Sequence, residues 1–242
     1  LTANFRIEDI KLDYKSTHFH EYYIDYDYYN PIYDTTYVNT NYKDILNGSK
    51  ISFLYTLNNT KNLYLTLSNG YKAGGVNQNP RLSSDNRVYK PEFNQNIDFG
   101  YKFKNNKILL NVNLFYMNRT DLQVSLSSQQ DSNNPNSFYF YTSNASKGNN
   151  YGLTLNYKNV SNSDFETYAN IGILKTQIDS YTYFTDESTP VQFKERDAAH
   201  APFYTLSYGF TKYYGLFSIG ADIHSKDKFY FSDSHNMQSK AY

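Results

Sequence analysis

Two histidines, His18 and His20, have a spacing that suits metal chemistry. In an extended segment residues two apart point to the same side, so the pair could bind a metal ion. A bare histidine pair in a polar loop is more often incidental. The chain has no cysteine, which excludes a cysteine-ligated zinc site. We therefore predict no metal site and no cofactor.

Basic and tyrosine side chains gather around a glycine-containing stretch at residues 69–77 and in the polar segment after it. Arginine and lysine donors together with tyrosine suit an anionic ligand. The stretch lacks the spacing of a phosphate-binding loop and a helix for a phosphate to cap. Its glycines are expected to permit positive φ angles and a sharp turn at a strand exit. The predicted ligand-binding residues are Tyr71, Lys72, Arg81, Arg87 and Tyr89. The alternative is a solvated loop, or basic contacts to lipopolysaccharide phosphates.

Carboxylates at polar strand positions, such as Glu92 and Asp98, could suggest a hydrolase. They fit the lining of a polar interior better, since no Ser-His-Asp order, metal-ligand cluster or activated nucleophile accompanies them. The 242-residue chain has 23 basic and 23 acidic residues, a net charge of zero that lacks the electrostatic footprint of a nucleic-acid binder. We expect neither an enzyme nor a nucleic-acid partner.

The elements that position these residues are strands. From Glu92 to Phe103 the odd positions are almost all apolar or aromatic, whereas the even positions are polar or glycine. No window approaches the roughly 18 to 20 apolar residues that a spanning helix needs. A transmembrane β-barrel instead alternates lipid-facing apolar residues with polar ones, and an aromatic content of 19% suits its girdles. The same alternation recurs at residues 51–57, 63–67, 151–157, 165–173 and 217–223.

The connections between the predicted strands alternate in length. Short ones fall at 58–61, 104–107, 160–164 and 212–215, and long ones at about 15–47, 72–90, 127–137, 178–200 and 232–239. Outer-membrane barrels have short periplasmic turns and long extracellular loops. We therefore predict an all-β, antiparallel transmembrane barrel, with strands longer than a membrane crossing projecting on the long-loop side. About ten strands are expected, at roughly 1–14, 48–57, 62–71, 91–103, 107–126, 137–159, 164–177, 201–211, 216–231 and from 240 onward.

Ten strands with two free edges cannot stand alone in lipid, because each edge exposes unpaired backbone groups that cost several kcal/mol apiece. We expect strands upstream and downstream to complete the barrel. The chain starts without a methionine or a signal peptide, so it is expected to be part of a longer polypeptide.

An ordered series of motifs resembles the barrel of TonB-dependent outer-membrane receptors. Residues 63–75 are similar to the family pattern LYASVSKGYKAGG, and residues 114–124 to LFYMDYKDLQV. Each match is weak alone, but eight in the family's order are strong together. The other six lie at residues 1–6, 89–102, 144–155, 201–206, 228–231 and 238–242.

The resemblance implies that residues 1–242 are one partial barrel domain, about the second half of a plugged barrel of about 22 strands. The family's plug, its TonB-contacting segment and the closing C-terminal strands are not in this chain. The implied function is uptake of ferric siderophore complexes across the outer membrane of a Gram-negative bacterium, with this chain giving barrel wall and ligand-binding loops. Implied partners are the chelate, the protein's own plug, the TonB complex through that plug, and outer-membrane lipid and lipopolysaccharide.

Other interpretations stay open at this point. One is TonB-dependent uptake of cobalamin, a nickel chelate or an oligosaccharide, because one fold hosts many ligands. Another is a passive porin-like or adhesin-like surface barrel, which would lack a plug. A third is a soluble β-rich carbohydrate-binding module, which would need a second sheet over its aromatic stripes.

Overall fold

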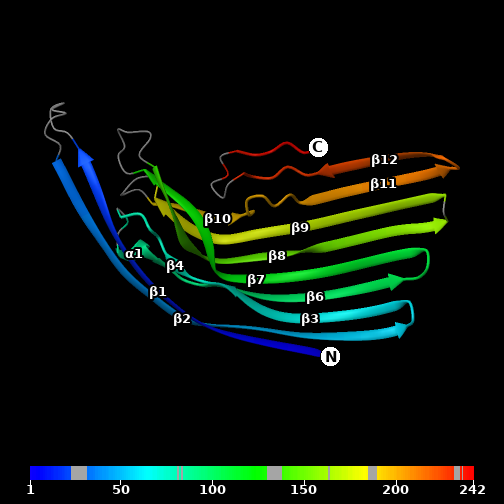
Figure 1. Cartoon of the computed structure of the whole chain (residues 1–242), viewed down its shortest axis with the longest axis horizontal. Helices are drawn as coiled ribbons and strands as arrows, with labels where there is room; N and C mark the ends of the chain where they lie inside the picture. Colours follow the sequence, from blue (N-terminus) through cyan, green and yellow to red (C-terminus); the bar gives the residue numbers. More distant parts are fainter. Residues whose placement is uncertain are drawn as a thin grey trace.

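The computed structural model describes residues 1–22, 32–80, 82, 84–129, 138–162, 164–184, 190–231, 235 and 237–242. Within them ten strands form one antiparallel sheet, in the order β1-β2-β3-β6-β7-β8-β9-β11-β12 with β10 paired to β9 (Figure 1). These strands are β1 (Thr2–Tyr22), β2 (Ile32–Asn58), β3 (Lys61–Lys72), β6 (Glu92–Lys104), β7 (Ile108–Gln129), β8 (Phe138–Asn162), β9 (Phe165–Phe184), β10 (Pro190–Arg196), β11 (Tyr204–Tyr214) and β12 (Phe217–Lys226). The short pieces β4 (Gly75–Val76), α1 (Ser84–Arg87) and β5 (Val88–Tyr89) lie between β3 and β6.

The sheet confirms the predicted all-β antiparallel class and the short turns. Pairing closes directly across the turns between Asn58 and Lys61 and between Tyr214 and Phe217. The strands lie side by side from β1 to β12, and these two outer strands do not pair with each other (Figure 1). The sheet is therefore open, as expected for a partial barrel.

One face of the sheet, called the outer face, exposes apolar side chains in rows that cross the strands. The row Ile51, Leu67, Ile97, Tyr116 and Tyr151 follows the register from β2 to β8. All five side chains are exposed although they are apolar or aromatic. A continuous apolar surface of this kind is costly in water and suits contact with lipid. In the described part of the chain, no helix is long and apolar enough to cross a bilayer.

The opposite, inner face is polar and carries rings laid across glycines. Tyr64 lies opposite Gly100, and a Cβ on that glycine would come within 2.2 Å of the ring. The Tyr64 hydroxyl donates to Asn113 Oδ1 at 2.9 Å, and the Asn113 amide donates to Asp98 Oδ1 at 3.2 Å. Asp98 thus belongs to a hydrogen-bonded network on the wall. Tyr168 opposite Gly209 and Phe115 opposite Gly152 repeat the arrangement.

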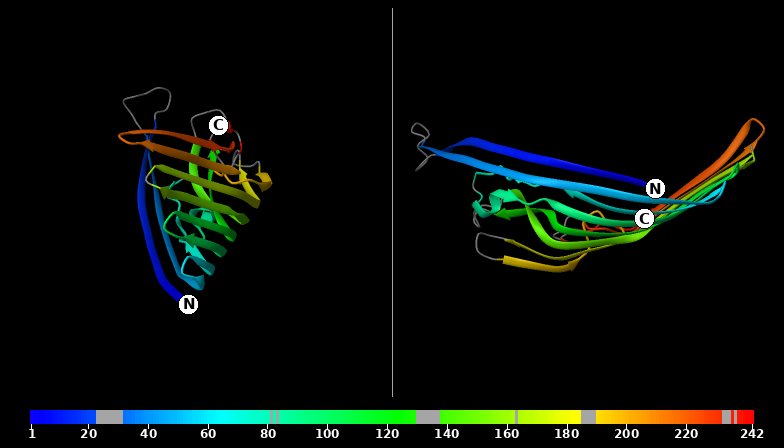
Figure 2. Two further views of the ribbon diagram at one scale, coloured as in Figure 1. Left: turned by 90° about the vertical axis from the view of Figure 1, so that its right-hand side faces the viewer. Right: turned by 90° about the horizontal axis from the view of Figure 1, so that it is seen from below.

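The structure corrects the predicted loop at residues 15–47. The two strands continue through most of it, and β1 and β2 pair from Thr2↔Ser52 up to Tyr22↔Ile32. Cross-strand pairing satisfies the backbone of this stretch. Val38, Tyr42 and Leu46 of β2, which share one face by alternation, are buried as well. Since β2 pairs with β3 only from Ser49 to Asn58, the hairpin above that level, residues 7–22 and 32–48, leaves the sheet as a separate arm (Figure 2).

Two further boundaries differ from the prediction. The expected loop at 178–200 is largely a hairpin, because β9 runs to Phe184 and β10 pairs back onto it. The last predicted full strand ends at Lys226 rather than near 231. Tyr242 then exchanges backbone hydrogen bonds with Lys226 at 2.7 and 3.1 Å, so the chain returns to β12 where a strand from residue 240 was expected.

Candidate functional site

The segment between β3 and β6, residues 73–91, is called the β3–β6 loop. It lies between the arm and the far ends of β7 and β8, on the side away from the short turns (Figure 1). Gly75 and Val76 pair with Tyr89 and Val88, and the Asn77 amide donates to the Arg87 carbonyl at 2.8 Å. The segment expected to be a long loop is therefore a small folded unit, with the single helical turn α1 at its tip.

Asn77 attaches this unit to β8. Its buried side chain donates from Nδ2 to the carbonyls of Thr142 and Asn86, each at 2.8 Å. Its Oδ1 accepts the Thr142 amide, also at 2.8 Å. The side chain reproduces the pair of hydrogen bonds that a neighbouring strand would make with Thr142. One amide thereby holds the β3–β6 loop against a strand far away in sequence.

Glu92 and Gln123 hold the base of the loop to β7. The Glu92 carboxylate, 6% exposed, accepts Arg119 Nε at 2.7 Å and the Gln123 amide at 2.9 Å. The Gln123 side chain donates to the carbonyls of Ala73 at 2.8 Å and Lys90 at 3.0 Å. A buried carboxylate is stabilised only when its lone pairs are used in this way. Both ends of the loop are thus bound to one point on β7.

An apolar cluster completes the attachment. Leu82 of the loop is buried with residues of β7, β8 and β9, among them Leu122 and Tyr141. Asp121, just before this stretch of β7, has a φ of 51°, a left-handed conformation that interrupts the alternation of a strand. The other members of the cluster are Val124, Leu126 and Ile178.

Two glycines of the loop serve close approach rather than the positive φ angle that we predicted. Among the described glycines, only Gly215 has a positive φ. A Cβ on Gly74 would come within 2.5 Å of the Tyr42 hydroxyl, and one on Gly75 within 2.6 Å of the Tyr89 hydroxyl. Gly74 therefore lets the arm pack on the β3–β6 loop without an intervening side chain, and Gly75 leaves room for the Tyr89 ring inside the loop.

Two predicted ligand-binding residues, Tyr71 and Lys72, lie at the end of β3, where the arm separates from the sheet. The Tyr71 hydroxyl donates to Glu8 Oε2 at 2.7 Å, and the Arg6 guanidinium lies 5.9 Å from its ring centroid. The Lys72 side chain is exposed, and within the described residues no group accepts its ammonium. Lys72 is therefore the predicted residue whose charge is free for a ligand.

Of the other predicted residues, one holds the backbone of the loop and one is placed beside a loop glycine. The Arg87 guanidinium donates to the carbonyls of Asn79, Pro80 and Leu82, the last at 2.7 Å, so it holds the loop's own turn. Tyr89 lies in β5 with its hydroxyl beside Gly75. Arg81 lies outside the described residues, as does the side chain of His20. His18, the other histidine of the pair considered for metal binding, contacts Ser16 Oγ through Nε2 at 2.9 Å.

The site offers phenol hydroxyls and, within the described residues, the exposed cations of Lys72 and Lys90. Burial, together with the Asp44 carboxylate at 3.2 Å, raises the pKa of Tyr42 to about 12, so this phenol stays protonated. Within the described residues, histidine, aspartate and glutamate form no group of three or more that could hold a metal ion. Hydroxyl donors and ammonium groups can bind an oxygen-rich or anionic ligand.

Sequence reasoning missed the residues that assemble this site. Asn77, Gln123 and Asn144 were three amides among many in an asparagine-rich chain. Asn144 accepts the Lys90 amide at 2.8 Å and donates to the Asp121 carbonyl at 2.7 Å. The one available signal was position, since Glu92 directly follows Pro91 at a strand start, where a carboxylate can meet free backbone donors.

The open antiparallel sheet, its apolar outer face and its polar inner face match a known family. The family described as "TonB dependent receptor-like, beta-barrel" matches residues 1–242, and the chain belongs to it. Its members are transport receptors rather than enzymes, and they are β-barrel proteins of the outer membrane. A search of curated protein sequences gave no match.

Solved structures with the same fold include three receptors and transporters. The ferric yersiniabactin uptake receptor FyuA from Yersinia pestis is 17% identical with a TM-score of 0.65, over 99% of this chain and 33% of that one. The copper transporter OprC is 13% identical with a TM-score of 0.72, over 99% and 35%. The ferric-catecholate import receptor Fiu from E. coli K12 is 15% identical with a TM-score of 0.69, over 99% and 34%. The chain spans about a third of the length of each.

Proposed function

We propose that the protein containing this chain is an outer-membrane, TonB-dependent transporter of ferric siderophore complexes, with residues 1–242 supplying barrel wall and part of the ligand-binding surface. The observation that carries the proposal is the folded β3–β6 loop. Its attachment to β7 and β8 leaves Lys72 exposed at the end of β3, on the face of the sheet opposite to Tyr71 by strand alternation. An exposed cation whose ammonium has no acceptor among the described residues suits an anionic chelate. Two of the three neighbours named above take up ferric complexes.

The residues are proposed to act in different ways. Lys72 contacts the chelate from the end of β3, and Tyr89 does so from β5. Tyr71 points to the other face and acts through its hydrogen bond to Glu8 on the arm. Arg87 acts indirectly, because its guanidinium holds the loop that carries Tyr89. Arg81 belongs to the same basic segment and is proposed as a further contact. The plug and the TonB complex, as partners of the whole protein, open the path for the bound chelate.

The test uses the complete native polypeptide that contains residues 1–242, produced in cells starved of iron. Uptake of radiolabelled iron is measured with catecholate, hydroxamate and mixed-ligand siderophores, beside a copper complex and cobalamin. Energy-dependent uptake of one ferric complex, abolished when TonB is deleted, is expected. Uptake that persists without TonB would favour a passive porin instead. Uptake confined to the copper complex or to cobalamin would overturn the iron assignment.

A matched pair of variants tests the site itself. Lys72→Gln removes the free cation, whereas Lys43→Gln removes an exposed cation from the arm, where it pairs across the strands with Lys11. We expect about a tenfold weaker equilibrium binding of the anionic ferric chelate for Lys72→Gln, as for loss of one charge-assisted contact. Lys43→Gln should bind as the unaltered protein does. Equal affinities in the two variants would remove Lys72 from the site.

A further inference from the structure

Two neighbouring short turns at the other end of the sheet carry an uncompensated positive charge. Residues 57–64 and 99–110 form two neighbouring hairpin ends and contain four lysines, Lys61, Lys102, Lys104 and Lys107, but no aspartate or glutamate. The two turns are joined directly, because the Lys104 amide donates to the Thr60 carbonyl at 2.8 Å. Within the described residues, no carboxylate forms an ion pair with any of the four.

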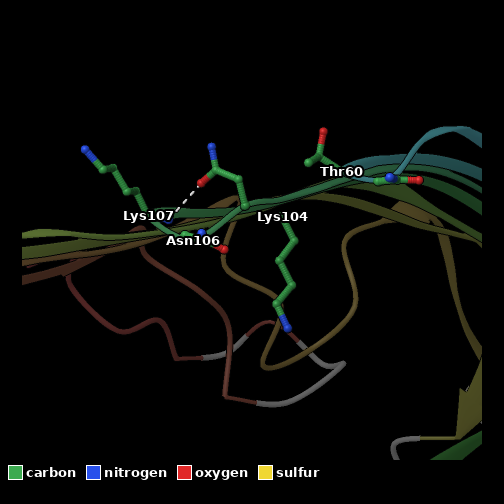
Figure 3. A pocket seen from close by; sticks show the side chains of 6 residues that line it. Thr60, Lys104, Asn106 and Lys107 are labelled. Atoms are coloured by element: carbon green, nitrogen blue, oxygen red, sulfur yellow. Dashed lines mark hydrogen bonds between the residues drawn. The ribbon is translucent and has the colours of Figure 1, made fainter.

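The four lysines divide between the two faces of the sheet. Lys61 shares the outer face with Leu63 and Leu65 by strand alternation, whereas Lys102 and Lys104 share the inner face with Asp98. Figure 3 shows Lys107 and Thr60 extending from one side of the ribbon and Lys104 from the other. Lys61 and Lys107 are therefore the outer pair, and Lys102 and Lys104 are the inner pair.

An open hollow of about 520 Å³ lies between these turns, lined by Asn59, Thr60, Lys104, Asn105, Asn106 and Lys107 (Figure 3). The turns hold their own shape. Asn105 Oδ1 accepts the amides of Lys107 and Ile108 at 2.8 and 2.7 Å, and Asn58 Oδ1 accepts the Thr60 hydroxyl at 2.9 Å. The outer ammonium groups are thus held on a fixed frame without an internal partner.

We propose that the outer pair binds the phosphate of a phospholipid headgroup in the leaflet that meets the short turns. This inference depends on the membrane placement proposed above. The exposed outer-face side chains of Tyr55 and Leu57 lie directly before the first turn, where they could contact the acyl chains of the same lipid. Lysine stems follow apolar surface and bring the ammonium to the phosphate level. The apolar strip beside the cations favours a lipid over a free phosphate ion.

The experiment places the complete native polypeptide in nanodiscs of phosphatidylcholine with a minor fraction of phosphatidylglycerol. Native mass spectrometry then counts the phosphatidylglycerol molecules that stay bound when the disc is removed. The double variant Lys61→Gln/Lys107→Gln should retain phosphatidylglycerol with roughly fivefold lower affinity per lysine removed. The matched control, Lys102→Gln/Lys104→Gln, removes equal charge from the same turns on the inner face and should retain it normally.

Each other outcome overturns the inference. If the outer variant retains as much lipid as the unaltered protein, or if the inner variant loses as much, the outer pair is not a headgroup site. If excess inorganic phosphate displaces the lipid completely, the site binds a soluble oxyanion. Failure of the unaltered protein to enter the nanodisc would contradict the membrane placement itself, a result that is distinguishable from the others.

Discussion

Strand β7 has two leucines whose side chains differ in exposure, one on each side of Asp121. Leu114, near the short turns, is 48% exposed on the outer face, whereas Leu122 further along the strand is 3% exposed. Alternation alone would place both on one face, since both positions are even. Asp121, with its φ of 51°, lies directly before Leu122 and interrupts that alternation. On β7, the part near the short turns, called the lower wall, exposes Leu114, and the part beside the β3–β6 loop, called the upper wall, buries Leu122.

The difference indicates which medium covers each part. In the lower wall no described segment covers Leu114, as expected where lipid is the neighbour. In the upper wall Leu122 packs against Leu82 of the β3–β6 loop, as expected where water would otherwise reach it. The change occurs between Tyr116, which is exposed, and Leu122. The membrane boundary on β7 is therefore expected within these few residues.

Truncation of the two leucines gives the largest expected effect and tests this comparison directly. Leu122→Ala leaves a cavity in a protein core and should lower the free energy of unfolding by about 2–5 kcal/mol. Leu114→Ala replaces one lipid-facing apolar group by a smaller one and should cost about 1 kcal/mol or less. Both are measured by urea unfolding of the protein in the same detergent. Equal losses would mean that the two parts of β7 do not differ in their surroundings.

Two carboxylates with different burial sharpen the comparison. Glu92→Gln leaves Arg119 without its charge partner in a largely buried position, and should cost about 2–3 kcal/mol, since Arg119 keeps some contact with water. Glu8→Gln on the arm removes a more exposed acceptor of Arg6 and Tyr71 and should cost about 1 kcal/mol or less. The free energy of unfolding of both variants is measured in urea. A larger loss for Glu8→Gln would show that the arm contact, rather than the base of the loop, stabilises the upper wall.

Loss of the Asn77 side chain should act locally. Asn77→Ala removes three hydrogen bonds and leaves the Thr142 backbone unpaired, which should favour opening of the loop by about 1–3 kcal/mol. Faster hydrogen exchange is expected at the Thr142 amide and across residues 75–89, with little change in β3. Asn86→Ala, which keeps its backbone acceptor, is the control and should exchange normally. If both variants exchange alike, the Asn77 side chain does not hold the loop.

The lower wall was predictable from sequence, and the upper wall was not. A period of two, as from Glu92 to Phe103, fixes which side chains share a face, and short polar turns fix neighbouring strands. The attachment of the β3–β6 loop depends on contacts such as Asn77 with Thr142, which are 65 residues apart. Single amides carry no periodic signal. The arm was missed because its buried residues, Val38, Tyr42 and Leu46, recur only every four residues among polar ones, so the period of two is weak there.

The smallest predicted effect concerns the contact between arm and loop. The pKa of Tyr42 is raised to about 12 by burial and by Asp44, from an ordinary value of 10.0. Its contribution to stability is therefore fully present below about pH 10 and is lost as pH rises through about 12. This residue lies well beyond the strand length that crosses the membrane, so it titrates from the aqueous side.

Tyr42→Phe keeps the ring but removes the hydroxyl that donates to Asp44 beside Gly74. We expect a loss of about 0.5–1.5 kcal/mol at neutral pH, seen as faster hydrogen exchange in the arm. Between pH 10 and 12 the difference between the two proteins should shrink, because the unaltered protein then loses the same contact. A difference that stays constant across that range would mean that the pKa of Tyr42 is not raised in the folded protein.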